Sequence, residues 1–385
     1  MRTVRLDAFM PRRLPSVNPA KFQSETFELW SVPSFDVGAP EILKGSEIGS
    51  SKKVVETGDL LLSRIVPHIR RAWIVEPSTA HRQIGSGEWI TFRGEDFHAP
   101  YLRHILISDR FNAQLMQTIA GVGGSLLRAR PESVRNIEIP LPPLPEQKRI
   151  AAILDQADGL RKQRQRALDH LNQLGQSIFY EMFGDRNLDG KWKYPETELI
   201  NSCHKITDGT HQSPKWEDSG VPFLFSSNIR NQRISYETKK FIGNDTYAEL
   251  TRHSPVEKND VLYTAVGSFG HSAVVDGKTK FLFQRHIAQL KPNFEKLNST
   301  FLASFLESIA IKRHAERVAK GVAQKTVTLT EIKKFPLPVV PLETQKEFEM
   351  KISSVALARE GMELHSSQLD GCFSSFQQRA FRGEL

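Results

Sequence analysis

The chain has 385 residues, a formal net charge of +8 and 39% hydrophobic residues, so length and composition predict two or three packed domains, and the charge favours an anionic partner. Its two cysteines are too few for a disulfide framework and fit a reducing cytoplasm. No stretch reaches the roughly 18 apolar residues that a membrane-spanning helix needs, and the basic first residues lack the apolar segment of a secretory signal.

Residues 1–143 are expected to form a mixed α/β domain. Short runs rich in β-branched and aromatic residues, separated by Gly, Pro and Ser, predict strands at Thr26–Val32, Asp59–Ile65, Arg71–Val75 and Glu88–Phe92. A helix is expected to follow at Pro100–Ala120, where large apolar residues are spaced for one buried face.

Residues 144–186 predict one long helix with a coiled-coil seam. Apolar residues recur with a seven-residue repeat, and the positions between them are mostly charged or Gln. At about 1.5 Å per residue the helix would run roughly 55–60 Å, so we expect it to need a partner helix. The seam is expected at Ile150, Ile153, Leu160, Leu171, Leu174 and Ile178.

Residues 187–340 repeat the plan of the first domain. The segments Gly58–Leu61 and Asn259–Leu262 hold equivalent places, about 200 residues apart. Strands are predicted at Pro222–Phe225, Asp260–Ala265, Ser272–Val275 and His286–Leu290, and a helix at Phe301–Val318.

Residues 341–385 predict a second long helix in the same heptad phase. The proline-rich lead-in repeats as well, because Ile139–Leu141 with Gln147 corresponds to Leu337–Val339 with Gln345. A shared heptad phase behind a shared lead-in indicates an internal duplication. Shifted by 198 residues, the seam falls on Phe348, Val355, Met362, Leu369 and Phe376.

Polar side chains that could read DNA gather in one segment of each domain. Lys and Arg bind phosphates, while amide and guanidinium groups reach base edges. For each candidate the alternative is an exposed basic face without a ligand. The candidates are Arg64, His68, Arg70 and Arg71 in the first domain and Asn228, Arg230 and Arg233 in the second.

The chain resembles the specificity subunits of type I restriction-modification systems. The lead-in IPLPPLPEQKRIAAILDQAD and the segments Gly85–Ile90 and Asp208–Pro214 carry the likeness. The resemblance implies an α+β fold, in which two similar α/β target recognition domains are separated by two long antiparallel coiled-coil helices. Each domain would read half of a split DNA site. His211, within the Asp208–Pro214 segment, joins the DNA-binding candidates through this resemblance.

The resemblance also implies the partners, which are double-stranded DNA, two modification subunits and restriction subunits, without a membrane. The chain itself would perform no chemistry and hold no cofactor. The modification subunits would bind S-adenosylmethionine and methylate adenine, and the restriction subunits would use ATP and Mg for translocation and cleavage.

Catalytic alternatives lack their motifs. The segment Asp276–Thr279 has Ser272 where a P-loop needs its first glycine. Cys203, His204 and His211 lack a fourth metal ligand at a familiar spacing, so no metal is expected. The other function that fits the pattern is a coiled-coil assembly adaptor whose globular domains do not bind DNA.

Overall fold

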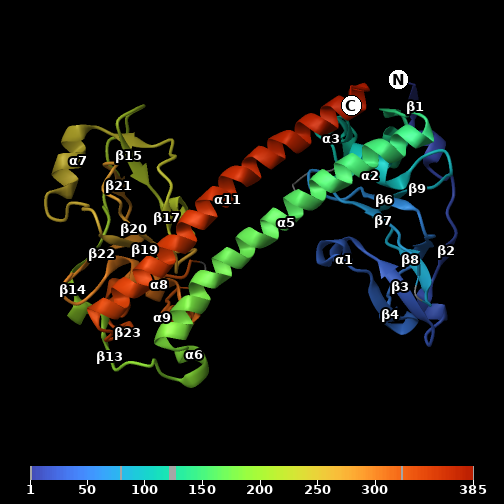
Figure 1. Cartoon of the computed structure of the whole chain (residues 1–385). Coiled ribbons are helices and arrows are strands. Elements are labelled where there is room, and N and C mark those ends of the chain that lie inside the picture. Colours follow the sequence, from blue (N-terminus) through green and yellow to red (C-terminus); the bar gives the residue numbers. More distant parts are fainter. Residues whose placement is uncertain (1, 79, 121–126, 322–323, 385) are drawn as a thin grey trace. The chain divides into compact units, whose positions relative to one another are not determined.

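The computed structural model describes residues 2–78, 80–120, 127–321 and 324–384. It divides into two compact units: unit 1 is Met1–Gln165 with Leu364–Leu385, and unit 2 is Arg166–Glu363. Each unit holds one globular domain and part of each of two long helices, α5 (Leu144–Phe183) and α11 (Leu342–Arg382) (Figure 1). Within the described residues, every helix is too short or too polar to serve as a membrane span.

The globular domain of unit 1 is built on a five-stranded sheet, in the order β2-β5-β8-β3-β4, and a three-stranded sheet, β7-β6-β9. Its helices are α1 (Val32–Val37), α2 (Ala99–Leu106), α3 (Asp109–Met116) and α4 (Pro131–Arg135). Its strands are β1 (Thr3–Arg5), β2 (Ser16–Val17), β3 (Thr26–Trp30), β4 (Glu41–Lys44), β5 (Lys52–Val54), β6 (Leu60–Ser63), β7 (Ala72–Ile74), β8 (Arg82–Gly85), β9 (Trp89–Phe92), β10 (Ile119–Ala120), β11 (Arg128–Ala129) and β12 (Glu138–Pro140).

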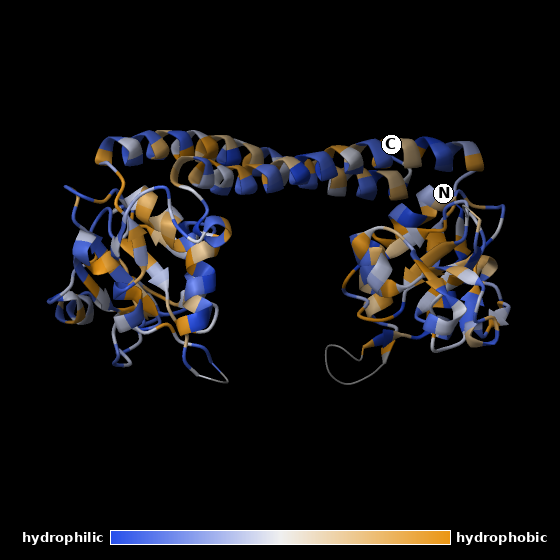
Figure 2. Cartoon of the chain, turned by 90° about the horizontal axis from the view of Figure 1, so that it is seen from below, coloured by the Kyte–Doolittle hydropathy of each residue, from blue (hydrophilic) through white to orange (hydrophobic). Residues whose placement is uncertain are grey.

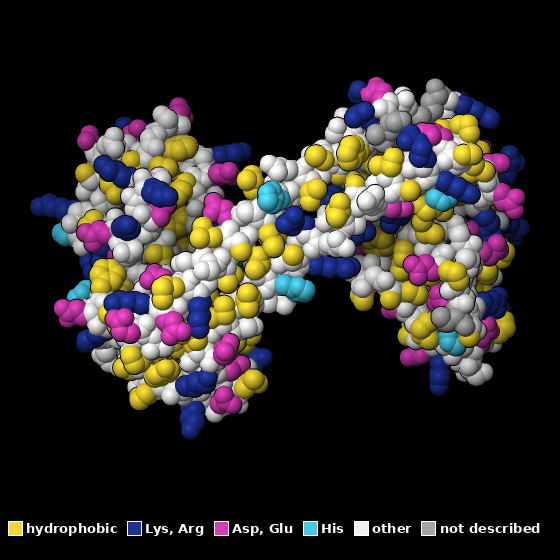
Figure 3. Space-filling view, in the orientation of Figure 1, with side chains coloured by type: hydrophobic (Ala, Val, Ile, Leu, Met, Phe, Trp, Pro, Cys, Tyr) yellow, Lys and Arg dark blue, Asp and Glu magenta, His cyan; other side chains and the backbone are white. Residues whose placement is uncertain are grey.

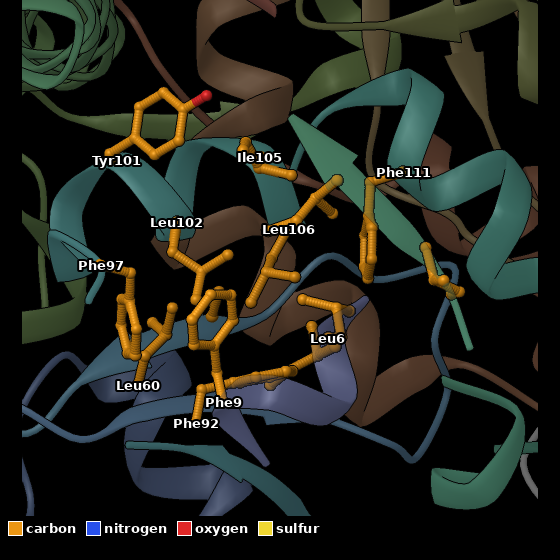
Figure 4. Close-up of a cluster of buried hydrophobic side chains, with 14 of the residues drawn as sticks. Leu6, Phe9, Leu60, Phe92, Phe97, Tyr101, Leu102, Ile105, Leu106 and Phe111 are labelled. Atoms are coloured by element: carbon orange, nitrogen blue, oxygen red, sulfur yellow. The ribbon is translucent and has the colours of Figure 1, made fainter. Parts of the chain in front are cut away.

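The main core of unit 1 lies between the three-stranded sheet and α2. Leu60 and Phe92 from the sheet and Tyr101 and Leu102 from α2 are fully buried in it (Figure 4). Hydrophobic residues gather in the same way inside the domain of unit 2 (Figure 2).

Unit 2 carries a four-stranded sheet, β14-β22-β19-β20, and a three-stranded sheet, β18-β15-β21. Its shorter helices are α6 (Arg186–Asp189), α7 (Asn244–Thr251), α8 (Ser299–Glu307), α9 (Ile309–Val318) and α10 (Leu329–Lys333). Its strands are β13 (Glu196–Glu198), β14 (Cys203–Asp208), β15 (Val221–Leu224), β16 (Ile229–Arg230), β17 (Arg233–Ile234), β18 (Phe241–Ile242), β19 (Val261–Thr264), β20 (Ser272–Val274), β21 (Leu282–Phe283), β22 (Ile287–Pro292) and β23 (Pro336–Pro338).

The duplication extends to the strand pairing. In unit 1 β6 pairs antiparallel with β7 and β9, and in unit 2 β19 pairs antiparallel with β20 and β22. In both units a buried aspartate precedes the central strand and binds a basic residue just after β9 or within β22. Asp59 binds Arg93 at 2.6 Å, and Asp260 binds Lys291 at 2.9 Å. Since each carboxylate is buried, its cationic partner offsets the desolvation of the charge.

The helix predicted at Pro100–Ala120 is two helices, α2 and α3, and the helix predicted at Phe301–Val318 is likewise split into α8 and α9. A serine causes the break in both units. The Ser108 hydroxyl accepts a hydrogen bond from the Phe111 N–H, and the Ser308 hydroxyl accepts one from the Ile311 N–H. Each serine therefore acts as the N-cap of a new helix.

In each unit the long helices pack together, and they run antiparallel. In unit 1 Arg161 of α5 binds Asp370 of α11 at 2.6 Å. In unit 2 the ring of Phe179, late in α5, lies 5.6 Å from that of Phe348, early in α11. Early α5 thus meets late α11, and late α5 meets early α11.

The buried face of the helix pair differs in part from the predicted seam. Leu160 and Leu174 are 50% and 44% exposed, while Leu168 and the helical Gly175 lie on the covered side. In α11, likewise, Ile352, Arg359 and Phe373 are covered although the predicted seam does not include them. The remaining predicted seam residues are buried or half-buried, namely Ile150, Ile153, Leu171, Ile178, Phe348, Val355, Met362, Leu369 and Phe376.

The difference in register has a physical cause. Steps of three then four residues and of four then three residues both fit a seven-residue repeat. The choice depends on how each helix is rotated at its end. Phe183 and Phe381 are buried in the cores of their units, against Phe301 and Tyr101, and these contacts fix the rotation.

A buried glutamine joins the start of α5 to the domain of unit 1. Gln147 is 1% exposed. Its Oε1 accepts a hydrogen bond from the backbone N–H of His98, the N-cap of α2, at 2.8 Å. Its Nε2 donates to the carbonyl oxygen of Pro142 at 2.8 Å. One side chain therefore satisfies two backbone groups and links α5, α2 and the lead-in.

Gln345 makes the same joint in unit 2. It is also 1% exposed, accepts from the N–H of Asn298, the N-cap of α8, and donates to the carbonyl oxygen of Val340, both at 2.8 Å. We call these two arrangements the glutamine joints.

We expect Leu168→Ala to lower the free energy of unfolding by about 2–4 kcal/mol, because it would leave a cavity on the covered face. Leu174→Ala should cost less than about 1 kcal/mol, since that side chain is half exposed. Urea unfolding of the two variants tests the observed register. A larger loss for Leu174→Ala would favour the register predicted from the heptads.

Gln147→Leu should lower the free energy of unfolding by about 2–4 kcal/mol, because the His98 N–H and the Pro142 carbonyl would lose their partner. Gln156→Leu is the matched control, since Gln156 is exposed on the same helix and should change stability by less than about 0.5 kcal/mol. Equal unfolding midpoints for the two variants would refute the joint.

Candidate nucleic-acid interface

In unit 1 the four predicted residues Arg64, His68, Arg70 and Arg71 lie on one loop, between β6 and β7. Val66 in this loop has a φ of 48°, a left-handed conformation that is unfavourable for a β-branched residue. Its N–H donates to the carbonyl oxygen of Leu127 at 3.0 Å. The backbone bond holds the loop in a strained shape, as is common at binding sites.

Arg64 carries the least compensated charge of the loop. Glu88 is shared by two guanidinium groups, since it hydrogen-bonds Arg128 at 3.2 Å and lies 3.8 Å from Arg64. The buried Nε of Arg64 has no hydrogen-bond partner among the described residues. Two cations therefore share one carboxylate, which leaves excess positive charge for an anion.

Arg70 and Arg71 are held within the domain. Arg71 donates two hydrogen bonds to Asp36, at 2.7 and 2.8 Å, and its side chain is 12% exposed. The same pairing lowers the pKa of Asp36. Arg70 lies 2.6 Å from Asp109, at the start of α3. His68, between Arg64 and Arg70 in the sequence, is exposed.

In unit 2 Asn228, Arg230 and Arg233 come together on the hairpin of β16 and β17. The turn residues Asn231 and Gln232 have φ values of 53° and 59°, as a two-residue hairpin turn requires. Arg230 donates to the carbonyl oxygens of Ser226 and Ile229 at 3.0 and 2.7 Å. Arg233 pairs with Glu363 of α11 and is 46% exposed.

Asn228 differs from its predicted role. It is 9% exposed. Its Nδ2 donates to the carbonyl oxygens of Ser235 and Glu237, and its Oδ1 accepts from the N–H of Phe225, all at 2.9 Å. Since both amide donors are used inside the domain, the side chain builds the hairpin and has no free donor for a base edge.

His211 lies on a separate loop, after β14. Its Nε2 is 2.9 Å from Asp208, and the side chain is 62% exposed. Thr210, next to it, pairs with a second loop, because the N–H of Arg285 donates to the Thr210 carbonyl at 3.1 Å. Arg285 is exposed, so two basic residues from distant segments lie close together.

Sequence analysis missed Arg285 and also the unit 2 counterpart of the β6–β7 loop. That counterpart joins β19 to β20 and runs through Val266 and Gly267 to His271. Gly267, at the place of Val66, has a φ of 73° and donates to the carbonyl oxygen of Lys325 at 2.9 Å. The equivalent aspartates before β6 and β19 could have located the β19–β20 loop from the sequence. That loop, however, lacks the arginines of the β6–β7 loop.

No group of three or more metal-binding side chains occurs within the described ranges. The loops instead offer guanidinium, imidazole and amide groups. These donors suit phosphates and base edges.

A family model, "Type I restriction modification DNA specificity domain", matches the chain twice, at residues 16–170 and 199–355. The two matches correspond to the two copies of the duplication. Together they cover well over half of the 385 residues.

Known proteins with related sequences are specificity subunits. The chain is 24% identical over 276 residues to the type I restriction enzyme EcoBI specificity subunit of Escherichia coli. This alignment covers 64% of this chain and 58% of that protein. It is 25% identical over 342 residues to the putative type I restriction enzyme MjaX specificity subunit of Methanocaldococcus jannaschii, with coverages of 83% and 76%. The chain thus spans 58% of the first relative's length and 76% of the second's.

Solved structures share the fold. A chain in a structure on complex assembly and conformational transition of the type I R-M system aligns with a TM-score of 0.60 and 21% identity, covering 100% of this chain and 98% of that one. The type I restriction-modification S subunit from M. genitalium aligns with a TM-score of 0.55 and 11% identity, covering 99% and 96%. Because the family model matches both halves of the duplication, the chain belongs to the family of type I restriction modification DNA specificity domains.

Proposed function

We propose that this chain is the specificity subunit of a type I restriction-modification complex and reads a bipartite DNA target. The observation that supports this most is the double match to a DNA specificity domain, on two domains whose exposed loops differ. Two equivalent domains that carry different loops can each bind a different short DNA sequence.

The proposal divides the chain into residues 1–143 and 187–340 as target recognition domains and residues 144–186 and 341–385 as conserved helices. Arg64 and His68 carry DNA contacts in the first domain. His211, Arg230 and Arg233 carry them in the second, together with Arg285. Arg70 and Arg71 mainly hold the loop in place. Arg71 is 12% exposed and makes two hydrogen bonds to Asp36, and Arg70 binds both Asp109 and the carbonyl oxygen of Ile107.

The chain performs no chemistry in this proposal. It directs adenine methylation and DNA cleavage by modification and restriction subunits, which hold S-adenosylmethionine, ATP and Mg.

Hydrophobic side chains reach the surface along the long helices (Figure 3). Within unit 2, Met350 and Leu357 lie seven residues apart on α11 and are 65% and 70% exposed. Such a stripe suits packing against helices of a partner, and we assign it to the two modification subunits.

Arg64→Ala should weaken DNA binding by the assembled methyltransferase about tenfold and reduce the salt dependence of binding by about one phosphate contact. Arg71→Ala is the matched control, because its guanidinium is bound to Asp36. It should lower the melting temperature more than Arg64→Ala does. Fluorescence anisotropy at several salt concentrations, with thermal melts, separates the two effects. A larger change in the salt slope for Arg71→Ala would reverse the assignment.

Replacing residues 1–143 with the equivalent domain of a related specificity subunit should change one half of the recognised sequence and preserve the other half. The reason is that each domain has its own core. Methylome sequencing of cells that carry the hybrid and its modification subunit shows the motif directly. If neither half of the motif changed, or if both halves changed, the two domains would not recognise DNA independently. If the chain were an assembly adaptor that binds no DNA, no methylated motif would be found.

A further inference from the structure

Unit 2 contains a cavity of about 250 Å³ between the two long helices and the domain. Gly175 of α5, Arg359 of α11 and Ser304 of α8 line it, together with the hairpin residue Gln232. The cavity is half enclosed and has room for a fragment of a drug-sized ligand rather than for a whole one.

The equivalent place in unit 1 is filled. Along the long helices Gly175 corresponds to Phe373, by the shift of 198 residues that relates them. In the domain helices Ser304 corresponds to His104, because the N-caps of α2 and α8 are equivalent. The rings of Phe373 and His104 lie 6.1 Å apart. Unit 2 thus has a glycine and a serine where unit 1 has two rings.

The arginine at this place has its partners in unit 1. Arg161 donates to Asp370 at 2.6 Å and to Asp158 at 3.2 Å. Its guanidinium also lies 4.5 Å from the centre of the Phe373 ring. The cation is therefore compensated by two carboxylates and one aromatic face.

The arginine of unit 2 has lost these partners. Arg359 corresponds to Arg161, but Asn172 and Ala356 stand at the places of Asp370 and Asp158. Arg359 keeps one long hydrogen bond, of 3.4 Å, to the Asn172 side chain, and Glu363 lies 3.7 Å from its Nε. Glu363 also pairs with Arg233, so one carboxylate faces two arginines.

Two buried polar atoms in the cavity wall have no hydrogen-bond partner within the described chain, the Oγ of Ser304 and the Nε of Arg359. Ser304 is 8% exposed, and the Arg359 side chain is 17% exposed. Unpaired buried polar groups are rare, because each costs free energy unless a ligand or water satisfies it.

The other charged groups that line the cavity are Lys312, Glu307 and the imidazole of His271. Glu307 already accepts a hydrogen bond from the N–H of Ser272 at 2.9 Å. Burial raises the pKa of Glu307 and lowers that of His271. The two cations Arg359 and Lys312 face one carboxylate, Glu307, so the cavity wall has a positive bias.

We propose that this cavity is a binding site for an aromatic ring that carries a carboxylate. The ring takes the place that Phe373 fills in unit 1, against Gly175 and the apolar wall of Ile352 and Phe179. The carboxylate binds Arg359 as the aspartates bind Arg161. The group comes from a free aromatic acid or from an aromatic residue beside an acidic one in a partner subunit.

The probe for the test is 3-phenylpropionate, with 3-phenylpropanamide as its uncharged match. A ligand of this size should bind the purified full chain with a Kd of about 1 mM. At 10 mM it should raise the melting temperature by about 2–4 °C and show saturation transfer by NMR. The amide should bind at least tenfold more weakly. Equal binding of acid and amide, or no binding at 10 mM, would overturn the proposal.

Gly175→Phe should abolish binding of the probe, because it restores the ring that unit 1 has. The glycine accepts a side chain, since an added Cβ would meet only Ile352, at 3.7 Å. Gly361→Phe is the matched control, a helical glycine of the same unit with nothing within 4 Å, and should bind normally. If Gly175→Phe fails to fold, Arg359→Gln gives the answer, because it should remove the preference for the acid over the amide. Retained preference would refute the site.

The same measurement on the chain assembled with its modification subunit distinguishes the two sources. Loss of probe binding on assembly shows that the partner supplies the group. Undiminished binding shows that a free aromatic acid is the ligand.

Discussion

The structure depends on the antiparallel packing of α5 against α11, because neither globular core is complete without both helices. The core of unit 1 includes Ile150 and Leu154 from the start of α5, and Phe373 and Phe381 from the end of α11. More than 200 residues separate these two contributions along the chain. Unit 1 therefore closes only when the C-terminal segment has been made, whereas unit 2 is one continuous segment, Arg166–Glu363. This long-range closure makes a large entropic demand on folding.

Much of the architecture could be predicted from the sequence, because the duplication is visible at the helices, the lead-ins and the aspartates before β6 and β19. The central strands β6 and β19 begin and end within one or two residues of their predicted bounds. The helix register could not be settled, since the heptad repeat allows two rotations and the buried aromatic residues at the helix ends decide between them. The breaks at Ser108 and Ser308 were also missed, because the apolar spacing continues across them.

The candidate interface was harder to predict, since the sequence gives residue types without their partners. Arg71 and Arg64 look alike in the sequence. Only the fold shows that Arg71 is bound by Asp36, 35 residues away, while Arg64 shares Glu88 with Arg128. Asn228 has the right chemistry for a base edge, yet its amide is used by backbone carbonyls of its own hairpin. A surface charge is free or compensated according to long-range contacts, and these do not follow from local patterns.

The two copies have kept some features and lost others, and the difference follows what each feature does. The glutamine joints share two equivalent hydrogen bonds, all at 2.8 Å, because both domains must be attached to the helices in the same way. Gln345 adds a third bond, to the carbonyl oxygen of Lys296. The loops after β6 and β19 keep a left-handed residue at the same place but share few side chains, as the proposed recognition of two different half-sites requires. The residues around Arg161 and Arg359 fit neither the conserved attachment points nor the diverged loops. It belongs to the scaffold, yet Phe373 and Asp370 of one copy are Gly175 and Asn172 in the other. A scaffold position that needed only to be filled would have kept a bulky side chain. Arg359 lacks the two aspartates of Arg161, shares Glu363 with Arg233 and lies beside an unfilled ring position, and a group that binds there is the best explanation.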